Sequence, residues 1–269
     1  MKLTDWLLEN KSVFNDTDLR FLLKEAFNSS HLFTDDAILK QDQLDLLNNA
    51  KRLHKRGEPL AYILGKEIFF GLEFKVDDSV LIPRKETELI CLKAIDVIEQ
   101  KSLNSVLDLG CGSANMAISI IKSIDRKIFA VASDISPKAL KTAELNVIAH
   151  KIDLKLVNSN LLSSFKEKSF ELIITNPPYV EKDLIRGSLV FEPRIALEAG
   201  EDGLLYIREI ISQAHRYLKE GGFIIMEIGF RHKEMVESLV KDIKRYDIKE
   251  WIKDYGGHYR GVVLAKIQN

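Results

Sequence analysis

The chain of 269 residues has few cysteines, no long apolar run and almost no net charge. Only Cys91 and Cys111 are present, without a second pair or a histidine at ligand spacing, which argues against a disulfide framework or a zinc site. No apolar stretch approaches the roughly 18–20 residues that cross a bilayer, and the first residues contain no apolar core of signal-peptide length. We therefore expect a soluble, cytoplasmic monomer with no metal and no membrane partner.

The net charge of −1 gives no electrostatic reason to expect strong nonspecific binding to nucleic acid. A local basic patch stays possible at Lys51, Arg52, Lys55 and Arg56, near the end of a predicted helix. Cations are favoured at a helix C-terminus, and this is the simpler interpretation; the alternative is a surface for an acidic partner.

The first 65 residues or so show helical periodicity. Apolar residues recur in this way over 3–7, 19–26 and 44–50, with capping residues at 16–18 and 34–36. Alternation then predicts a β-hairpin whose strands cover 69–76 and 80–82, with its turn at 77–79. We expect a helical domain over 1–66, a hairpin linker over 67–84 and a larger domain over 85–269.

The larger domain alternates between strand and helix patterns, which predicts an α/β fold with a parallel sheet covered on both faces. The predicted strands are 105–109, 128–134, 154–157, 170–175, 223–228, a weak one near 247–252, and 262–265; the predicted helices are 87–100, 114–123, 136–149, 204–218 and 232–244.

One stiff polar-aromatic turn follows the predicted strand at 170–175: Asn176-Pro177-Pro178-Tyr179. Two consecutive prolines fix φ twice and keep the residue before each one extended. An amide and an aromatic ring are therefore held beside each other at the carboxyl end of a strand, where open α/β sheets bind their ligands.

Three further strand ends carry ligand-binding features. Gly110-Cys111-Gly112-Ser113-Ala114 follows the strand at 105–109, and its glycines allow a sharp turn before a helix N-terminus. The third glycine of a dinucleotide fingerprint is absent, since position 115 is Asn, so a nucleoside without a pyrophosphate fits better. Asp134 can accept hydrogen bonds from both ribose hydroxyls, although it could instead cap the next helix. Asn160-Leu161 would border the base.

We expect one cleft to contain the glycine turn, Asp134 and the Asn-Pro-Pro-Tyr turn. Together these features resemble those of the S-adenosylmethionine-dependent methyltransferases that act on planar amino nitrogens. This resemblance implies a Rossmann-like sheet and S-adenosyl-L-methionine as the cofactor, which Asn176 would also contact. A planar nitrogen is a poor nucleophile. Hydrogen bonds to the Asn176 oxygen and the Pro177 carbonyl would hold its N–H groups, while Pro178 and Tyr179 would line the acceptor and Tyr179 would stack on it. In-line positioning, and not a strong base, should supply most of the rate.

Several longer segments are similar to the protein-(glutamine-N5) methyltransferases of peptide-chain release factors. They are 58–65, 69–74, 81–88, 191–197, 201–204 and 254–260. This resemblance implies a helical substrate-recognition domain and methylation of the glutamine in the Gly-Gly-Gln loop of class I release factors.

The sequence departs from that family's pattern at Lys85, Ala114, Asn115 and Asn160-Leu161, mostly around the cofactor. Three alternatives stay open: methylation of a ribosomal-protein glutamine, methylation of adenine in nucleic acid, and a nucleotide-binding module without catalysis.

Overall fold

The computed structural model describes residues 1–28 and 37–268. The chain forms two compact units. One comprises Met1–Lys66 with Gly187–Phe191, and the other comprises Glu67–Arg186 with Glu192–Asn269. The dividing point in the first part of the chain thus falls between Lys66 and Glu67, and the hairpin that follows belongs to the larger unit.

The smaller unit is helical. Its elements are α1 (Leu3–Asn10), the 3-10 turn η1 (Lys11–Val13), α2 (Asp16–Phe27), α3 (Gln41–His54) and α4 (Leu60–Leu64). Their apolar faces enclose a core that includes Trp6, Leu22 and Leu47. The predicted cap at 16–18 is wrong by one residue, since Asn15 accepts the bond from the Asp18 N–H. The predicted cap at 34–36 lies outside the described residues.

A β-hairpin is present, but its turn is not where the sequence pattern places it. The strands are β1 (Lys66–Phe69) and β2 (Leu72–Lys75), and no strand forms over 80–82. Phe70 and Gly71 both have positive φ, 53° and 73°, as a two-residue hairpin turn requires. The Phe70 N–H donates to the Glu88 carboxylate, a contact that helps to hold a bulky residue in this conformation.

A seven-stranded sheet forms the centre of the larger unit, in the order β5-β4-β3-β6-β7-β9-β8. The strands are β3 (Ser105–Leu109), β4 (Phe129–Asp134), β5 (Lys155–Asn158), β6 (Phe170–Thr175), β7 (Leu218–Glu227), β8 (Tyr246–Lys253) and β9 (Tyr259–Lys266). The expected α/β class is confirmed, but the sheet is mixed. The first five strands in this order are parallel, whereas β9 is antiparallel to both β7 and β8. Only five residues join β8 to β9, too few for a crossover helix.

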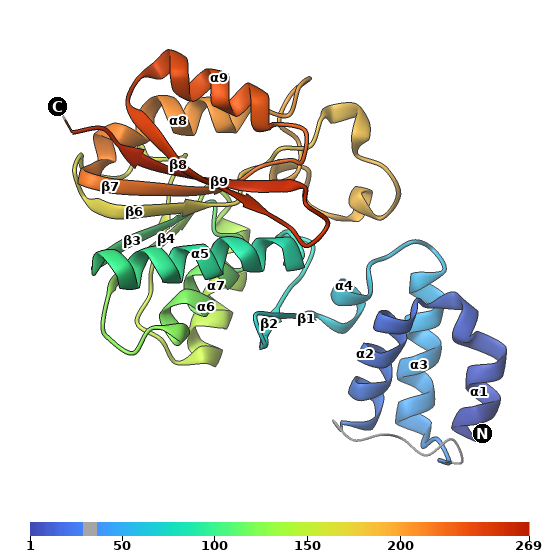
Figure 1. Cartoon of the computed structure of the whole chain (residues 1–269). Helices are drawn as coiled ribbons and strands as arrows, with labels where there is room; N and C mark the ends of the chain where they lie inside the picture. Colours follow the sequence, from blue (N-terminus) through green and yellow to red (C-terminus); the bar gives the residue numbers. More distant parts are fainter. Residues whose placement is uncertain (29–36, 269) are drawn as a thin grey trace. The chain divides into compact units, whose positions relative to one another are not determined.

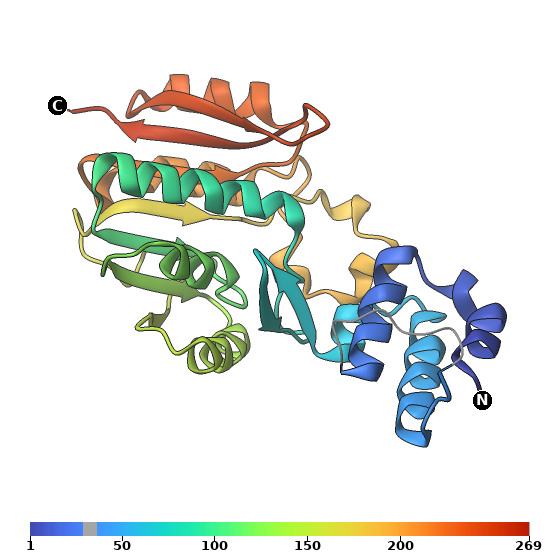
Figure 2. The same ribbon diagram turned by 60° about the horizontal axis from the view of Figure 1, so that its bottom comes forward.

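Helices cover both faces of this sheet. They are α5 (Lys85–Lys101), α6 (Asn115–Ser123), α7 (Pro137–His150), α8 (Leu205–Tyr217) and α9 (Lys233–Ile243). The larger unit also contains the 3-10 turns η2 (Lys182–Leu184) and η4 (Arg194–Ala196), whereas η3 (Gly187–Phe191) belongs to the smaller unit. Figures 1 and 2 show α8 and α9 on one face and α5, α6 and α7 on the other.

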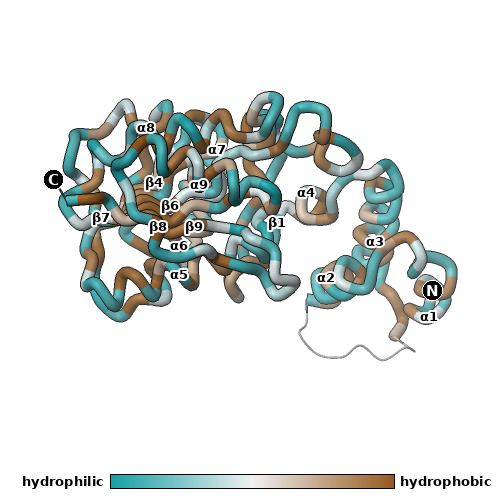
Figure 3. Tube along the Cα trace, turned by 45° about the horizontal axis from the view of Figure 1, so that its top comes forward, coloured by the Kyte–Doolittle hydropathy of each residue, from teal (hydrophilic) through white to brown (hydrophobic). Residues whose placement is uncertain are grey.

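Residues that alternate along each strand pack into two separate hydrophobic cores, one on each face of the sheet. Val106 packs with α5–α7, whereas its neighbour Leu107 packs with α8 and α9. Hydrophobic segments accordingly run along the central strands in Figure 3, near the labels β4, β6 and β9. Burial on both faces explains why these strands read as continuous apolar runs.

The parallel strands β3, β4 and β6 all end at the same edge of the sheet. Leu109 pairs with Ser133 on one side and with Thr175 on the other, and the Thr175 hydroxyl donates to the Leu109 carbonyl at 2.7 Å. The residues that follow these strands are therefore brought together.

Candidate active site

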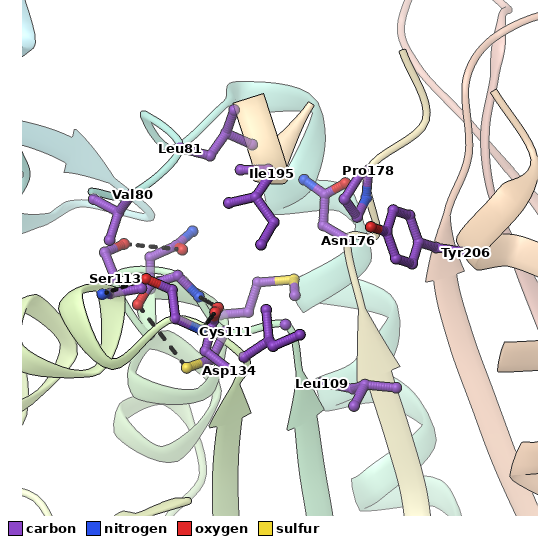
Figure 4. Close-up of a pocket in the computed structure, with 18 of the residues that line it drawn as sticks. Val80, Leu81, Leu109, Cys111, Ser113, Asp134, Asn176, Pro178, Ile195 and Tyr206 are labelled. Atoms are coloured by element: carbon purple, nitrogen blue, oxygen red, sulfur yellow. Dashed lines mark hydrogen bonds between the residues drawn. The ribbon is translucent and has the colours of Figure 1, made fainter. Parts of the chain in front are cut away.

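A cavity of about 370 Å³ opens at this edge of the sheet, entirely within the larger unit. Its volume lies in the range of small-molecule sites, about 300–1,000 Å³. In Figure 4, Asn176 and Pro178 lie on one side of the cavity, and Cys111, Ser113 and Asp134 lie on the other. The features that follow the strands β3, β4 and β6 thus face a common space.

The turn after β3 depends on two left-handed glycines. Gly110 has φ 74° and Gly112 has φ 52°, while an added Cβ on either would meet nothing within 4 Å. Both positions therefore favour glycine for its conformational freedom, and not for lack of space. Ala114 adopts a similar φ of 61°, a conformation that costs a residue with a Cβ about 1–2 kcal/mol.

Asp134 secures this turn from the end of β4. Its carboxylate accepts from the Gly112 N–H at 2.9 Å and from the Ser136 N–H at 2.8 Å. Burial raises the pKa of Asp134, and the two backbone donors act in the opposite direction. Ser136 itself caps α7 through the Ala139 N–H. Asp134 lines the cavity, so its remaining lone pairs can serve a ligand.

Four other residues expected near the cofactor also line the cavity: Cys111, Ser113, Asn160 and Leu161. Ala114, which was expected there too, is buried and does not belong to the lining. Leu161 has φ 47°, a left-handed conformation that turns the chain after Asn160. Burial raises the pKa of the Cys111 thiol well above its usual value, so this cysteine serves as packing and not as a nucleophile.

Within the Asn-Pro-Pro-Tyr turn, Asn176 and Pro178 line the cavity. Pro177 is buried, and neither it nor Tyr179 belongs to the lining. The Tyr179 ring packs against the core beneath α8 and α9 and meets the His232 ring edge-on, with centroids 6.3 Å apart. The stacking role expected of Tyr179 therefore stays a prediction.

A hydrogen-bonded chain runs from this turn to a carboxylate at the end of β7. The Asn176 amide donates to the Thr87 hydroxyl at 3.2 Å, and that hydroxyl donates to Glu227 at 2.6 Å. The other Glu227 oxygen accepts from the Tyr179 hydroxyl at 2.9 Å. Burial raises the pKa of Glu227 to about 7, although the hydrogen bonds from the two hydroxyl donors act to lower it.

Comparison with known proteins shows which family this chain belongs to. Residues 91–200 match the model of the methyltransferase small domain. A release factor glutamine methyltransferase of Fusobacterium nucleatum is 33% identical over 266 residues, which cover 97% of this chain and 73% of that protein. One from Clostridium botulinum is 31% identical, covering 99% of this chain and 100% of its own length.

The chain belongs to the release factor glutamine methyltransferase family. The expected family and enzyme class are thereby confirmed. Among solved structures, a ribosomal protein L11 methylase from Lactobacillus delbrueckii matches with a TM-score of 0.53 at 21% identity, over 72% of this chain and 84% of that one. At that identity the match shows a shared fold alone.

The donor set fits the cofactor that a methyltransferase of this class uses. The Asp134 carboxylate suits the two hydroxyls of a ribose, and the cavity has apolar walls at Leu109, Met116 and Leu161 for a flat base and the methylene groups beside a sulfonium. The open space over Gly110 and Gly112 lets a ligand approach the backbone.

Three of the departures from the family pattern, Asn115, Asn160 and Leu161, line this cavity, and none falls within the Asn-Pro-Pro-Tyr turn. Lys85 is the first residue of α5, where proline is favoured but not required. Ala114 and Asn115 stand at the start of α6, and Asn115 lines the cavity with Asn160 and Leu161. The expected effect of these departures on cofactor affinity stays a prediction.

Sequence reasoning missed Thr87 and Glu227. One signal was available for Glu227, because it is an acidic residue within the apolar run Phe223–Ile228. Thr87 gave no such signal, since it lies 89 residues from Asn176 in the chain. The reasoning also missed the cavity wall formed by Ile195, Leu205 and Tyr206.

Among the helices of residues 1–28 and 37–268, none is long and apolar enough to cross a membrane.

Proposed function

We propose that this enzyme transfers a methyl group from S-adenosyl-L-methionine to the N5 side-chain amide of the glutamine in the Gly-Gly-Gln motif of class I release factors. Family membership supports the substrate class. One observation carries the chemistry. One N–H of the Asn176 amide donates to Thr87, which orients the amide so that its oxygen can accept an N–H from a substrate in the cavity.

A primary amide matches this acceptor. One N–H of the glutamine amide would donate to the Asn176 oxygen and the other to the Pro177 carbonyl, which fixes the plane of the amide. The cofactor supplies a methyl group activated by its sulfonium. As the bond from nitrogen to methyl carbon forms, the bond from carbon to sulfur breaks, and the nitrogen then loses one proton to water.

Cofactor-binding roles are proposed for Gly110, Cys111, Gly112, Ser113 and Ala114 in the turn after β3, and for Asp134, Asn160 and Leu161. Pro178 is proposed as a wall of the acceptor site, and Tyr179 as its aromatic neighbour. Their positions at or beside one cavity support these roles.

Mass spectrometry of a release factor incubated with the enzyme and S-adenosylmethionine tests the reaction. We expect one added methyl group, located on the glutamine of the Gly-Gly-Gln motif. Asn176→Ala should abolish most of this turnover while cofactor affinity changes little. An unmodified glutamine after incubation with the unaltered enzyme would refute the proposal.

The same assay separates the alternatives. Tritiated methyl transferred to RNA or DNA would support adenine as the acceptor, and transfer to a ribosomal protein would support another glutamine. Calorimetry that shows tighter binding of NAD than of S-adenosylmethionine would support a nucleotide-binding module.

We also propose that residues 1–66 recognise the release factor, that 67–84 act as a linker and that 85–269 carry catalysis. The separate helical core of the first segment supports this division. Hydrogen exchange of the full chain, with and without release factor, should show added protection within Leu3–His54. Protection confined to the larger unit would contradict the assignment.

A further inference from the structure

A buried carboxylate stands behind the catalytic turn without lining the cavity. Glu227 is 1% exposed, and its two oxygens accept from Thr87 and Tyr179. Thr175, the last residue of β6, pairs with Met226 of β7, so Glu227 lies at the register position beside Asn176. The strand order thus sets an acceptor directly alongside the turn.

The direction of each hydrogen bond in this chain follows from simple counting. When the Glu227 carboxylate is ionised it can only accept, so the Thr87 hydroxyl then uses its single hydrogen on Glu227. Because its hydrogen is used in that bond, the Thr87 hydroxyl can only accept from Asn176. The group of Asn176 that donates to it must therefore be the amide NH2. The Asn176 oxygen is consequently turned away from Thr87.

This polarity matters because an asparagine amide has two nearly isosteric ends. With the oxygen toward the cavity, the site accepts N–H groups, as a primary amide requires. With the amide reversed, the site would present N–H donors. These donors can bind a carboxylate, but they cannot accept the N–H groups of a primary amide. The choice between glutamine and glutamate as a ligand would follow from the orientation of this side chain.

We propose that Glu227 and Thr87 are positioning residues that set the polarity of the Asn176 amide and thereby select a planar N–H donor over a carboxylate at the acceptor site. This rests on the proposed function and adds its specificity determinant. Glu227 is not the base for the reaction, because it does not line the cavity and both of its oxygens are engaged.

The substitution Thr87→Val tests this idea, because valine keeps the shape of threonine and removes the hydroxyl. Thr87→Ser is the matched control, since it retains the hydroxyl. For methylation of a release factor we expect kcat to fall by about 10- to 100-fold in Thr87→Val, the range for loss of a positioned polar group. Thr87→Ser should stay within about threefold, and both variants should bind S-adenosylmethionine with nearly unchanged affinity.

Two readouts do not depend on turnover. Exchange of the Asn176 side-chain NH2 protons, followed by NMR, should quicken in Thr87→Val and not in Thr87→Ser. A release factor with glutamate in place of the acceptor glutamine should compete better for Thr87→Val than for the unaltered enzyme.

The outcomes separate the two proposals. If the unaltered enzyme leaves the release factor unmethylated, the proposed function fails, while the exchange measurement still tests the hydrogen-bond chain. If the enzyme is active but Thr87→Val matches Thr87→Ser in kcat, NH2 exchange and glutamate competition, the positioning role is overturned. A Thr87→Val protein that unfolds or loses cofactor binding would also overturn it, since Thr87 would then be structural.

Discussion

Gly203 lies directly against the backbone of Tyr179: a Cβ atom on Gly203 would stand 2.5 Å from the Tyr179 carbonyl oxygen and 2.9 Å from the His232 ring. Gly203 is also left-handed, with φ 71°. The loop before α8 therefore packs against the Asn-Pro-Pro-Tyr turn at a position that tolerates no side chain.

Gly203→Ala should lower methyl transfer by at least about tenfold and destabilise the protein by several kcal/mol, because a backbone carbonyl cannot move aside cheaply. Gly257→Ala is the matched control. Gly257 has φ 81° but meets nothing within 4 Å, so alanine there should add only the conformational strain, about 1 kcal/mol. Turnover and thermal unfolding of both variants provide the comparison, and equal losses would mean that the contact with Tyr179 is unimportant.

The segment after the catalytic turn is anchored by an ion pair between Glu192 and Arg84, two residues 108 positions apart. The Glu192 carboxylate is 2% exposed and also accepts from the Ile82 N–H at 3.1 Å. Arg84→Ala would leave that carboxylate buried and unpaired, so we expect a loss of about 2 kcal/mol, discounted because Arg84 is partly exposed.

Adding Glu192→Gln to Arg84→Ala should restore most of that stability, because the neutral amide still accepts from the Ile82 N–H. Arg208→Ala serves as a control, since Arg208 and Asp202 form a pair in which both side chains are about half exposed; its removal should cost less than about 0.5 kcal/mol. Denaturant unfolding gives the stability of each variant. If Arg84→Ala and Arg208→Ala lost the same free energy of unfolding, the Arg84–Glu192 pair would contribute no more than an exposed surface pair.

The central strands and the catalytic turn could be predicted because each is a local pattern. The run 170–175 is apolar except for Glu171 and Thr175, and the strand forms over those same residues, nearly all of which are buried. The side of the sheet on which the glycine turn and Asp134 meet Asn176 follows from the parallel order alone.

The features that escaped prediction depend on contacts between distant residues. The hairpin turn was expected at the polar residues 77–79, but it forms at Phe70-Gly71, where a contact with Glu88 helps to hold an aromatic residue at positive φ. Thr87 belongs to the site only because α5 brings its hydroxyl to Glu227. No local pattern encodes either relationship.

Asp134→Asn should weaken cofactor binding more than it slows methyl transfer. Asparagine has one acceptor oxygen where aspartate has two, so its NH2 would face either the Gly112 N–H or the Ser136 N–H. We expect the Kd for S-adenosylmethionine to rise about tenfold or more and kcat at saturation to change by less than about threefold. Calorimetry and steady-state kinetics give the two values. Asp153→Asn, at an exposed pair with Lys127, should change neither. A fall in kcat without a change in Kd would place Asp134 outside cofactor binding.

Glu227 should make turnover and stability respond to pH in opposite directions. Its pKa in the folded protein is raised to about 7 by burial, Glu86 adds to the rise, and Arg260 opposes it. Below about pH 7 the carboxyl gains a proton and can donate, so the Thr87 hydroxyl is free to reverse the Asn176 amide. We therefore expect kcat to fall as the pH drops below about 7, and Glu227→Gln to remove this component.

The pH dependence of stability that Glu227 causes is opposite in direction to that of kcat. A folded pKa raised above the ordinary 4.5 of an unfolded glutamate means that the folded state holds its proton more tightly. The stabilisation is fully present below about pH 4.5 and is lost as the pH rises through about 7, an effect of about 3 kcal/mol. Unfolding of the unaltered enzyme and of Glu227→Gln at pH 5 and pH 8 should therefore show the variant gaining relative stability at pH 8. If both proteins lost stability equally between the two pH values, Glu227 would not be the group that titrates.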